Sequence, residues 1–234
     1  MSGYLLINLL IITIPLALSF EKNIKFYKKF NSVFISIISI GFIFLVWDVI
    51  AVRRGDWSFN KEYVYRSELS GLPFEEILFF VTVPFSTLFI YETLNYYIKE
   101  KTYNIHVKYF YISSLIFFII AVLNYDRYYT ATVFTFCGVI ILIQNIFMPA
   151  YVFSKNYMLT LLISFIPFLI VNYYLTSLPV VIYNPGTIMG IRFLTIPAED
   201  FFYSFSMISG WLLVYRWSEK YERNIILKND KSKA

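Results

Sequence analysis

The chain has 234 residues, of which 59% are apolar, 21% are aromatic and only 15% are charged. A soluble domain is nearer to about 45–50% apolar and about 25% charged, so this composition excludes an ordinary soluble domain and predicts a protein of the lipid bilayer. With one cysteine, one histidine and a formal net charge of +5, a disulfide scaffold and a histidine-rich metal centre are also excluded.

Seven apolar segments follow one another along the chain. A helix needs about 20 apolar residues to cross about 30 Å of hydrocarbon. The candidate segments are residues 4–20, 30–52, 76–98, 109–123, 130–153, 158–178 and 200–217. No Lys or Arg precedes the first apolar run, so we expect it to remain a helix and not to be a cleaved signal peptide. Seven crossings would place the two termini on opposite faces of the membrane.

The basic residues indicate which face is cytoplasmic. Most of the 20 Lys and Arg residues lie in the first, third and fifth loops and in the C-terminal tail. The positive-inside rule therefore predicts a multi-pass protein of the cell membrane, with the N-terminus outside and the C-terminus cytoplasmic. The positive charge then reflects topology and anionic membrane lipids, and nucleic acid is not an expected partner. Aromatic residues near segment ends, including Tyr128 and Tyr129, are predicted to form an interfacial belt.

An internal repeat organises the sequence. Residues 72–80 recur as residues 196–204, an offset of 124 positions. Three helices in each repeat and one linking helix would give both halves the same orientation. We therefore predict an all-α integral membrane fold, with seven transmembrane helices as a parallel 3+1+3 duplication. The predicted units are residues 1–104 for the first repeat, 105–127 for the linker helix and 128–234 for the second repeat with its basic cytoplasmic tail.

Two adjacent acids begin the third helix of each repeat. They are Glu75 and Glu76 in the first repeat, and Glu199 and Asp200 in the second. Acids that follow a proline are also typical of any helix N-terminus. Two copies favour a functional site, because ionisable groups at membrane depth are costly and usually functional. A pseudo-two-fold axis along the membrane normal would bring all four acids to one site. There, a carboxyl group that keeps its proton can act as an acid, and an ionised carboxylate can act as a base. Which residue takes which part stays open.

Further residues are candidates for contacts with a substrate. Aromatic rings next to the acids offer faces that stabilise a carbocation, although core packing is an equally good explanation for each. Asp48 is either a third member of the site or an interfacial cap, and Arg192 either orients a carboxylate or faces water. The candidate substrate-binding residues are Asp48, Trp47, Phe79, Phe80, Phe201, Phe202, Tyr203 and Arg192.

The doubled motif resembles the lycopene cyclase domain family, in its membrane-integral form with both halves fused in one chain. The likeness rests on Trp47-Asp48, Trp57-Ser58-Phe59-Asn60, residues 73–80, Gly190-Ile191-Arg192 and residues 197–203. It implies a lycopene beta-cyclase, an intramolecular lyase or isomerase of carotenoid biosynthesis that converts the ψ-ends of lycopene to β-ionone rings without a redox step. The implied partners are lycopene, membrane lipids and other carotenoid enzymes. No cofactor and no metal are implied.

Three other functions are alternatives to cyclisation. A seven-helix 3+1+3 transporter of small solutes would share the architecture, but the polar residues concentrate in the two acid–aromatic motifs. A retinal-type photoreceptor is excluded, because the seventh segment has no lysine between Asp200 and Trp217. A magnesium-dependent prenyl-diphosphate reaction is disfavoured, because the chain has no spaced Asp-rich motif. Whether one or both ends of the substrate are cyclised stays open.

Overall fold

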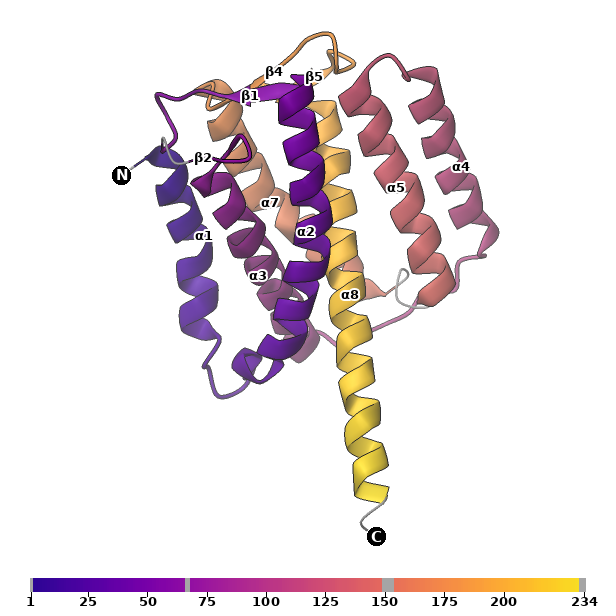
Figure 1. The fold of residues 1–234 in the computed structure, drawn as a ribbon. Helices are drawn as coiled ribbons and strands as arrows, with labels where there is room; N and C mark the ends of the chain where they lie inside the picture. Colours follow the sequence, from indigo (N-terminus) through magenta and orange to yellow (C-terminus); the bar gives the residue numbers. More distant parts are fainter. Residues whose placement is uncertain (1, 66–67, 149–153, 232–234) are drawn as a thin grey trace.

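The computed structural model of the chain describes residues 2–65, 68–148 and 154–231. Seven α-helices run side by side in this part of the chain, and short strands lie across one end of the bundle (Figure 1). The helices are α1 (Gly3–Leu18), α2 (Phe30–Arg54), α3 (Phe74–Tyr97), α4 (Lys108–Leu123), α5 (Tyr128–Phe147), α7 (Lys155–Ser177) and α8 (Ala198–Lys231), with a short 3-10 helix η1 (Phe26–Lys29) before α2. The strands are β1 (Trp57–Phe59), β2 (Glu68–Leu69), β3 (Leu72–Pro73), β4 (Val181–Tyr183), β5 (Arg192–Phe193) and β6 (Ile196–Pro197).

Each predicted apolar segment corresponds to one helix. In the described residues, four helices are long and apolar enough to cross a membrane: α2 with η1, α3, α5 and α7. Helices α1 and α4 are apolar but have only 16 residues each. Helix α8 has 34 residues, and polar and charged side chains interrupt its apolar stretch. The predicted segment 130–153 corresponds to α5, which ends at Phe147, and residues 149–153 lie outside the described residues.

The outer surface of the bundle is strongly apolar. Ile38 on α2, Val122 and Leu123 on α4, and Ile170 on α7 are 67–74% exposed. Contiguous apolar surface of this extent is rare on soluble monomers, whereas lipid is its natural surrounding. Lipid also explains the helices, because a segment in hydrocarbon must satisfy its backbone hydrogen-bonding groups internally. The all-helical, apolar character predicted from composition is therefore confirmed.

A two-residue hairpin precedes each helix that begins with the acids. Strands β2 and β3 are joined by Ser70 and Gly71, whose φ angles of 58° and 93° suit a tight turn of the type I′ class. Strands β5 and β6 form the equivalent hairpin, with Leu194 at φ 56°. Proline then ends each hairpin, because its missing N–H costs nothing where a helix begins. The sequence did not predict these strands, since two residues show no alternation.

Strands β1 and β4 join the two halves of the chain. They pair antiparallel, with Trp57 opposite Tyr183 and Ser58 opposite Ile182. Ser58 and Ile182 are also 124 positions apart, so this pair relates the halves by a local two-fold axis. The element order α-α-β-β-β-α occurs on both sides of α4, as the predicted duplication requires.

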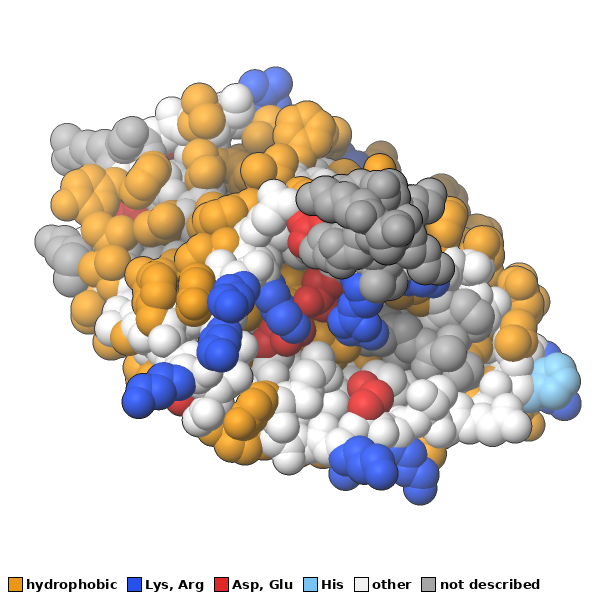
Figure 2. All heavy atoms as spheres, turned by 90° about the horizontal axis from the view of Figure 1, so that it is seen from below, with side chains coloured by type: hydrophobic (Ala, Val, Ile, Leu, Met, Phe, Trp, Pro, Cys, Tyr) orange, Lys and Arg blue, Asp and Glu red, His pale blue; other side chains and the backbone are white. Residues whose placement is uncertain are grey.

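The opposite end of the bundle is basic. The termini lie at opposite ends, and α8 extends beyond the other helices (Figure 1). Seen from that end, Lys and Arg side chains gather on this face, several of them beside acidic side chains near its centre (Figure 2). Lys29 forms ion pairs there with Glu92 of α3 and Glu219 of α8, which ties three helices together.

Candidate functional site

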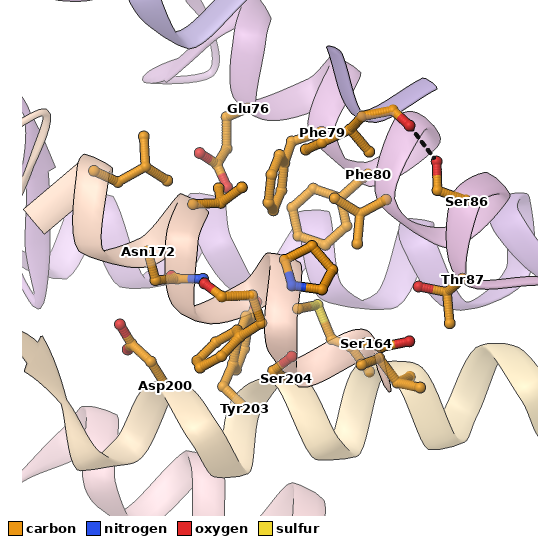
Figure 3. Close-up of a pocket in the computed structure, with 18 of the residues that line it drawn as sticks. Glu76, Phe79, Phe80, Ser86, Thr87, Ser164, Asn172, Asp200, Tyr203 and Ser204 are labelled. Carbon is orange, nitrogen blue, oxygen red and sulfur yellow. Dashed lines mark hydrogen bonds between the residues drawn. The ribbon is translucent and has the colours of Figure 1, made fainter. Parts of the chain in front are cut away.

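A cavity of about 430 Å³ lies inside the bundle, next to the strand-covered end. Helices α1, α3, α7 and α8 form most of its wall, and α2, α5, β1 and β4 each contribute residues. Its lining is mostly apolar, and the Ser86, Thr87 and Ser164 hydroxyls lie at the end away from Glu76 and Asp200 (Figure 3). Its size is within the range of about 300–1,000 Å³ that is usual for small-molecule sites.

One face of α3 and one face of α8 line this cavity. The lining positions follow the i, i+3, i+4, i+7 spacing of a helix face. On α3 they begin with Glu76, Phe79, Phe80 and Val83, and on α8 with Asp200, Tyr203, Ser204 and Met207. The two sets are related by the same offset of 124 residues. The repeat therefore presents the second acid of each pair to one shared space.

Glu76 and Asp200 come from different helices but lie at the same end of the cavity (Figure 3). Glu76 Oε2 accepts a hydrogen bond of 2.6 Å from the Tyr4 hydroxyl. Asp200 accepts one at each oxygen, from Tyr129 at 2.7 Å and from Tyr183 at 2.9 Å. Burial and the neighbouring Asp200 raise the pKa of the Tyr183 phenol well above its usual value, so this phenol remains a donor.

Asp48 belongs to the same group of acids. This α2 residue is buried, lines the cavity and accepts a hydrogen bond of 2.6 Å from Tyr203. Its counterpart in the repeat, Asn172 of α7, also lines the cavity. Of the two sequence-based alternatives for Asp48, the structure thus supports membership of the site over an interfacial cap.

Glu75 and Glu199 are fully buried but lie outside the cavity lining. Glu75 Oε1 accepts a hydrogen bond of 2.8 Å from the Tyr65 N–H and another from the Ser2 hydroxyl. In the second repeat, Glu199 Oε1 accepts bonds of 2.6 Å from the Met189 N–H and the Thr130 hydroxyl.

Tyr65 and Met189 are again 124 positions apart. Each of these two glutamates therefore holds the loop before its own hairpin. Their other oxygens, Oε2, have no hydrogen-bond partner among the described residues.

Several predicted substrate-binding residues do not line the cavity. Phe201 and Phe202 follow Asp200 directly and are turned about 100° and 200° from it around the helix, since a helix has 3.6 residues per turn. Phe201 packs against Phe168 at 5.0 Å between ring centroids, and Phe202 against Phe134 at 4.8 Å. Trp47 packs edge-on against a phenylalanine of α5.

Arg192 is exposed, and its guanidinium donates to the Thr195 carbonyl. The guanidinium also lies 5.9 Å from the centroid of the Tyr183 ring, so Arg192 faces solvent beside a residue that donates to Asp200. Tyr129, expected in the interfacial belt, is 2% exposed and donates to Asp200, so its side chain faces the site and not the outer surface.

The sequence reasoning missed several aromatic residues that line the cavity, among them Tyr4, Trp57, Tyr129 and Tyr183. Tyr4, Tyr129 and Tyr183 donate to the acids, and Trp57 packs against Tyr129 at 5.1 Å between ring centroids. The repeat contained a signal for these residues. Tyr183 aligns with Phe59 at the offset of 124, and tyrosines begin the first helix of both halves. In residues 2–65, 68–148 and 154–231, no three His, Cys, Asp or Glu side chains are grouped as metal ligands would be.

The chain matches one family model, described as lycopene cyclase, over residues 2–94 and again over residues 126–218. The two matched regions are themselves displaced by 124 positions, the offset of the acid motifs. No curated protein and no solved structure matches the chain. The match covers most of the chain, and membership of this family implies an enzyme of carotenoid cyclisation. The resemblance inferred from the doubled motif is thereby confirmed, and the chain belongs to the lycopene cyclase family.

Proposed function

We propose that this protein is a lycopene beta-cyclase that closes β-ionone rings by acid–base chemistry with no redox step. The observation that supports this most directly is the position of Glu76, Asp200 and Asp48 at one end of a mostly apolar cavity. A polyene end group would lie there beside carboxyl groups that are shielded from water. The transporter alternative has no support in the family match.

The reaction needs one proton donor and one proton acceptor. The acid protonates C2 of the terminal alkene, which leaves a cation at C1. The C5=C6 double bond attacks C1, the charge moves to C5, and the base removes the proton from C6. The substrate loses one proton and gains one, so the product is an isomer of the substrate.

The hydrogen bonds favour Asp200 as the base and Glu76 as the acid. Two phenols donate to Asp200, one at each oxygen, and donors to both oxygens stabilise the ionised form. Glu76 accepts a single phenol bond at Oε2, which leaves Oε1 to carry and deliver a proton. The rings of Phe79, Phe80 and Tyr203 line the same space and would stabilise the cation between the two steps. Glu75 and Glu199 act as positioning residues that hold the loops above the site.

The membrane arrangement is part of the proposal. Seven spans, built from repeat 1–104, linker helix 105–127 and repeat 128–234, would place the acids in the outer half of the bilayer. The basic end of the bundle would face the cytoplasm, where anionic lipids and positive-inside topology favour it (Figure 2). Membrane lipids and other carotenoid enzymes are then the partners within reach.

The test is pigment chromatography of a lycopene-accumulating bacterial host that expresses the chain. We expect the native chain and the exposed-acid control Glu62→Gln to form ring-bearing carotenes. Glu76→Gln and Asp200→Asn should leave lycopene unchanged at equal protein levels. A well-expressed, membrane-inserted native chain that forms no ring would refute the proposal.

A further inference from the structure

Part of the cavity wall is also part of the outer surface of the protein. Leu10 and Ile14 of α1 line the cavity, yet each is 65% exposed. Pro167 of α7 lines it too and is likewise exposed. Side chains with both properties mark the place where an internal cavity reaches the surface. This place is a side of the bundle, not one of its ends.

Helices α1 and α7 pack together near the strands. Tyr4 of α1 shares one buried apolar cluster with Val171 and Leu175 of α7. Leu10 and Ile14 lie about 9 Å and about 15 Å further along α1, at a rise of 1.5 Å per residue. In the proposed membrane arrangement this is the depth of the hydrocarbon, where the opening beside them would face lipid.

The equivalent place in the second repeat is closed. The offset of 124 relates Leu10 to Phe134, which is 3% exposed, and Ile14 to Gly138. Helix α4 covers both positions. Phe117 stacks on Phe134 with 5.9 Å between ring centroids, and the Phe118 ring fills the space beside Gly138. The linker helix thus breaks the two-fold symmetry and leaves an opening in the first half.

The cavity is also too short for a whole carotene, and its two ends differ. From Glu76 to Ile90, the lining residues of α3 cover about 21 Å. Lycopene is comparable in length to the hydrocarbon layer, about 30 Å. Thr87 and Ser164 lie at the end away from the acids (Figure 3), and the described lining residues there carry no carboxylate.

We propose that lycopene enters this cavity from the lipid through a lateral mouth formed by Leu10, Ile14 and Pro167, and that only half of the molecule is inside when it reacts. One ring is closed in each binding event, and the singly cyclised carotene leaves through the mouth before its other end can react. This inference rests on the proposed cyclase function.

The first test narrows the mouth. We expect Leu10→Trp and Ile14→Trp to raise KM for lycopene in phosphatidylcholine vesicles about tenfold or more. Leu115→Trp on α4, a similarly exposed position away from the cavity, should leave KM unchanged. Equal KM values for all three variants and the native chain would overturn the inference. If the native chain itself forms no ring, it is the proposed function that fails.

The second test detects the bound polyene directly. Ile14→Cys, in a Cys137→Ser background, should react with an apolar thiol reagent more slowly in lycopene-loaded vesicles than in empty ones. Leu115→Cys in the same background should show no protection. Equal protection by lycopene of the thiols at positions 14 and 115 would overturn the lateral mouth, even if an altered chain were inactive.

A time course tests the claim of one ring per binding event. With lycopene in excess, the carotene with one ring should accumulate outside the protein, and the carotene with two rings should appear only after a lag. Two-ringed product that forms from the start, with no pool of the one-ringed carotene, would overturn this claim.

Discussion

The two acids of each motif are neighbours in sequence but do different things in the fold. Glu76 and Asp200 line the cavity, where phenols donate to them. Glu75 and Glu199 accept loop N–H groups instead. A rotation of about 100° per helical residue is the physical reason, since it turns adjacent side chains to different surroundings.

This division predicts different responses to substitution. At equal amounts of folded protein, Glu75→Gln and Glu199→Gln should keep most of the cyclisation rate, because a side-chain amide oxygen still accepts the loop N–H. Asp200→Asn should lower the rate by about 10²–10⁴-fold, as expected for loss of a proton-transfer group. Chromatographic assays of purified protein check both. A comparable loss in Glu75→Gln would place that residue in the chemistry.

Glu75→Ala should mainly affect stability. It removes the acceptor of the Tyr65 N–H, and the loss of such a partly buried hydrogen bond costs about 0.5–1.5 kcal/mol of unfolding free energy. Thermal unfolding in detergent should therefore show a lower midpoint for Glu75→Ala than for Glu75→Gln. Equal midpoints would contradict the loop-holding role.

Asp48 and Tyr203 should behave as one unit. Tyr203 donates to Asp48 across 155 positions of sequence, and both line the cavity. Tyr203→Phe and Asp48→Asn should each slow cyclisation, and the double variant should be no slower than the worse single one, because each removes the same interaction. Tyr4→Phe combined with Tyr203→Phe provides the control, since Tyr4 donates to Glu76 on a different helix and its effect should add. Additive effects of Asp48→Asn and Tyr203→Phe would show that their contact has no part in the reaction.

At the level of elements, α4 is more than a connection between two repeats. It packs along α5, and its Ser114 hydroxyl donates to the Gly138 carbonyl at 2.8 Å. Gly138 has to be a glycine for this contact, because a Cβ there would lie 2.9 Å from the Phe118 ring. The close approach lets α4 cover the second repeat.

Two matched glycine substitutions test this contact. Gly138→Ala should lower the unfolding free energy of the detergent-solubilised protein, within the range of about 1–3 kcal/mol usual for overpacking. Gly41→Ala in α2 should be neutral or stabilising by up to about 1 kcal/mol, since the nearest atom to its added Cβ is 3.7 Å away. Equal thermal midpoints would show that α4 can shift away from α5 at little cost.

For the whole molecule, the two ends of the bundle predict its orientation. A reporter that is active only outside the cell should work when fused after Glu62 in the strand-covered end. A reporter that is active only in the cytoplasm should work when fused after Ala234. Most basic residues are at the C-terminal end, so this orientation follows from the positive-inside rule. The reverse pattern of activity would refute it.

Much of the architecture follows from features that are local in sequence. Apolar segments of sufficient length form helices because lipid offers no other partner for the backbone. The doubled Pro-x-acid-acid motif produces the same hairpin and helix start twice, since the chemistry of each copy is nearly the same. The family match at the same offset agrees with that repeat.

The helix period by itself also places Glu76 and Asp200 on a different helix face from the acids that precede them. Lining residues follow these two acids at three, four and seven positions, and this spacing can be read from the sequence without the tertiary structure. Phe201 and Phe202 are predicted at the substrate because they follow Asp200 in sequence. Neighbours in sequence, however, lie on different faces of a helix.

Composition and the repeated motif determine the helices and the family and predict the lipid environment, because each depends on segments of about 20 residues or fewer. The partners of the acids depend on tertiary structure: Tyr4 meets Glu76 across 72 positions, and Tyr129 meets Asp200 across 71. The position of the cavity's opening depends on it as well, because α4 closes one repeat and leaves the other uncovered. Such contacts arise from how the helices rotate and pack against one another, which no single segment specifies.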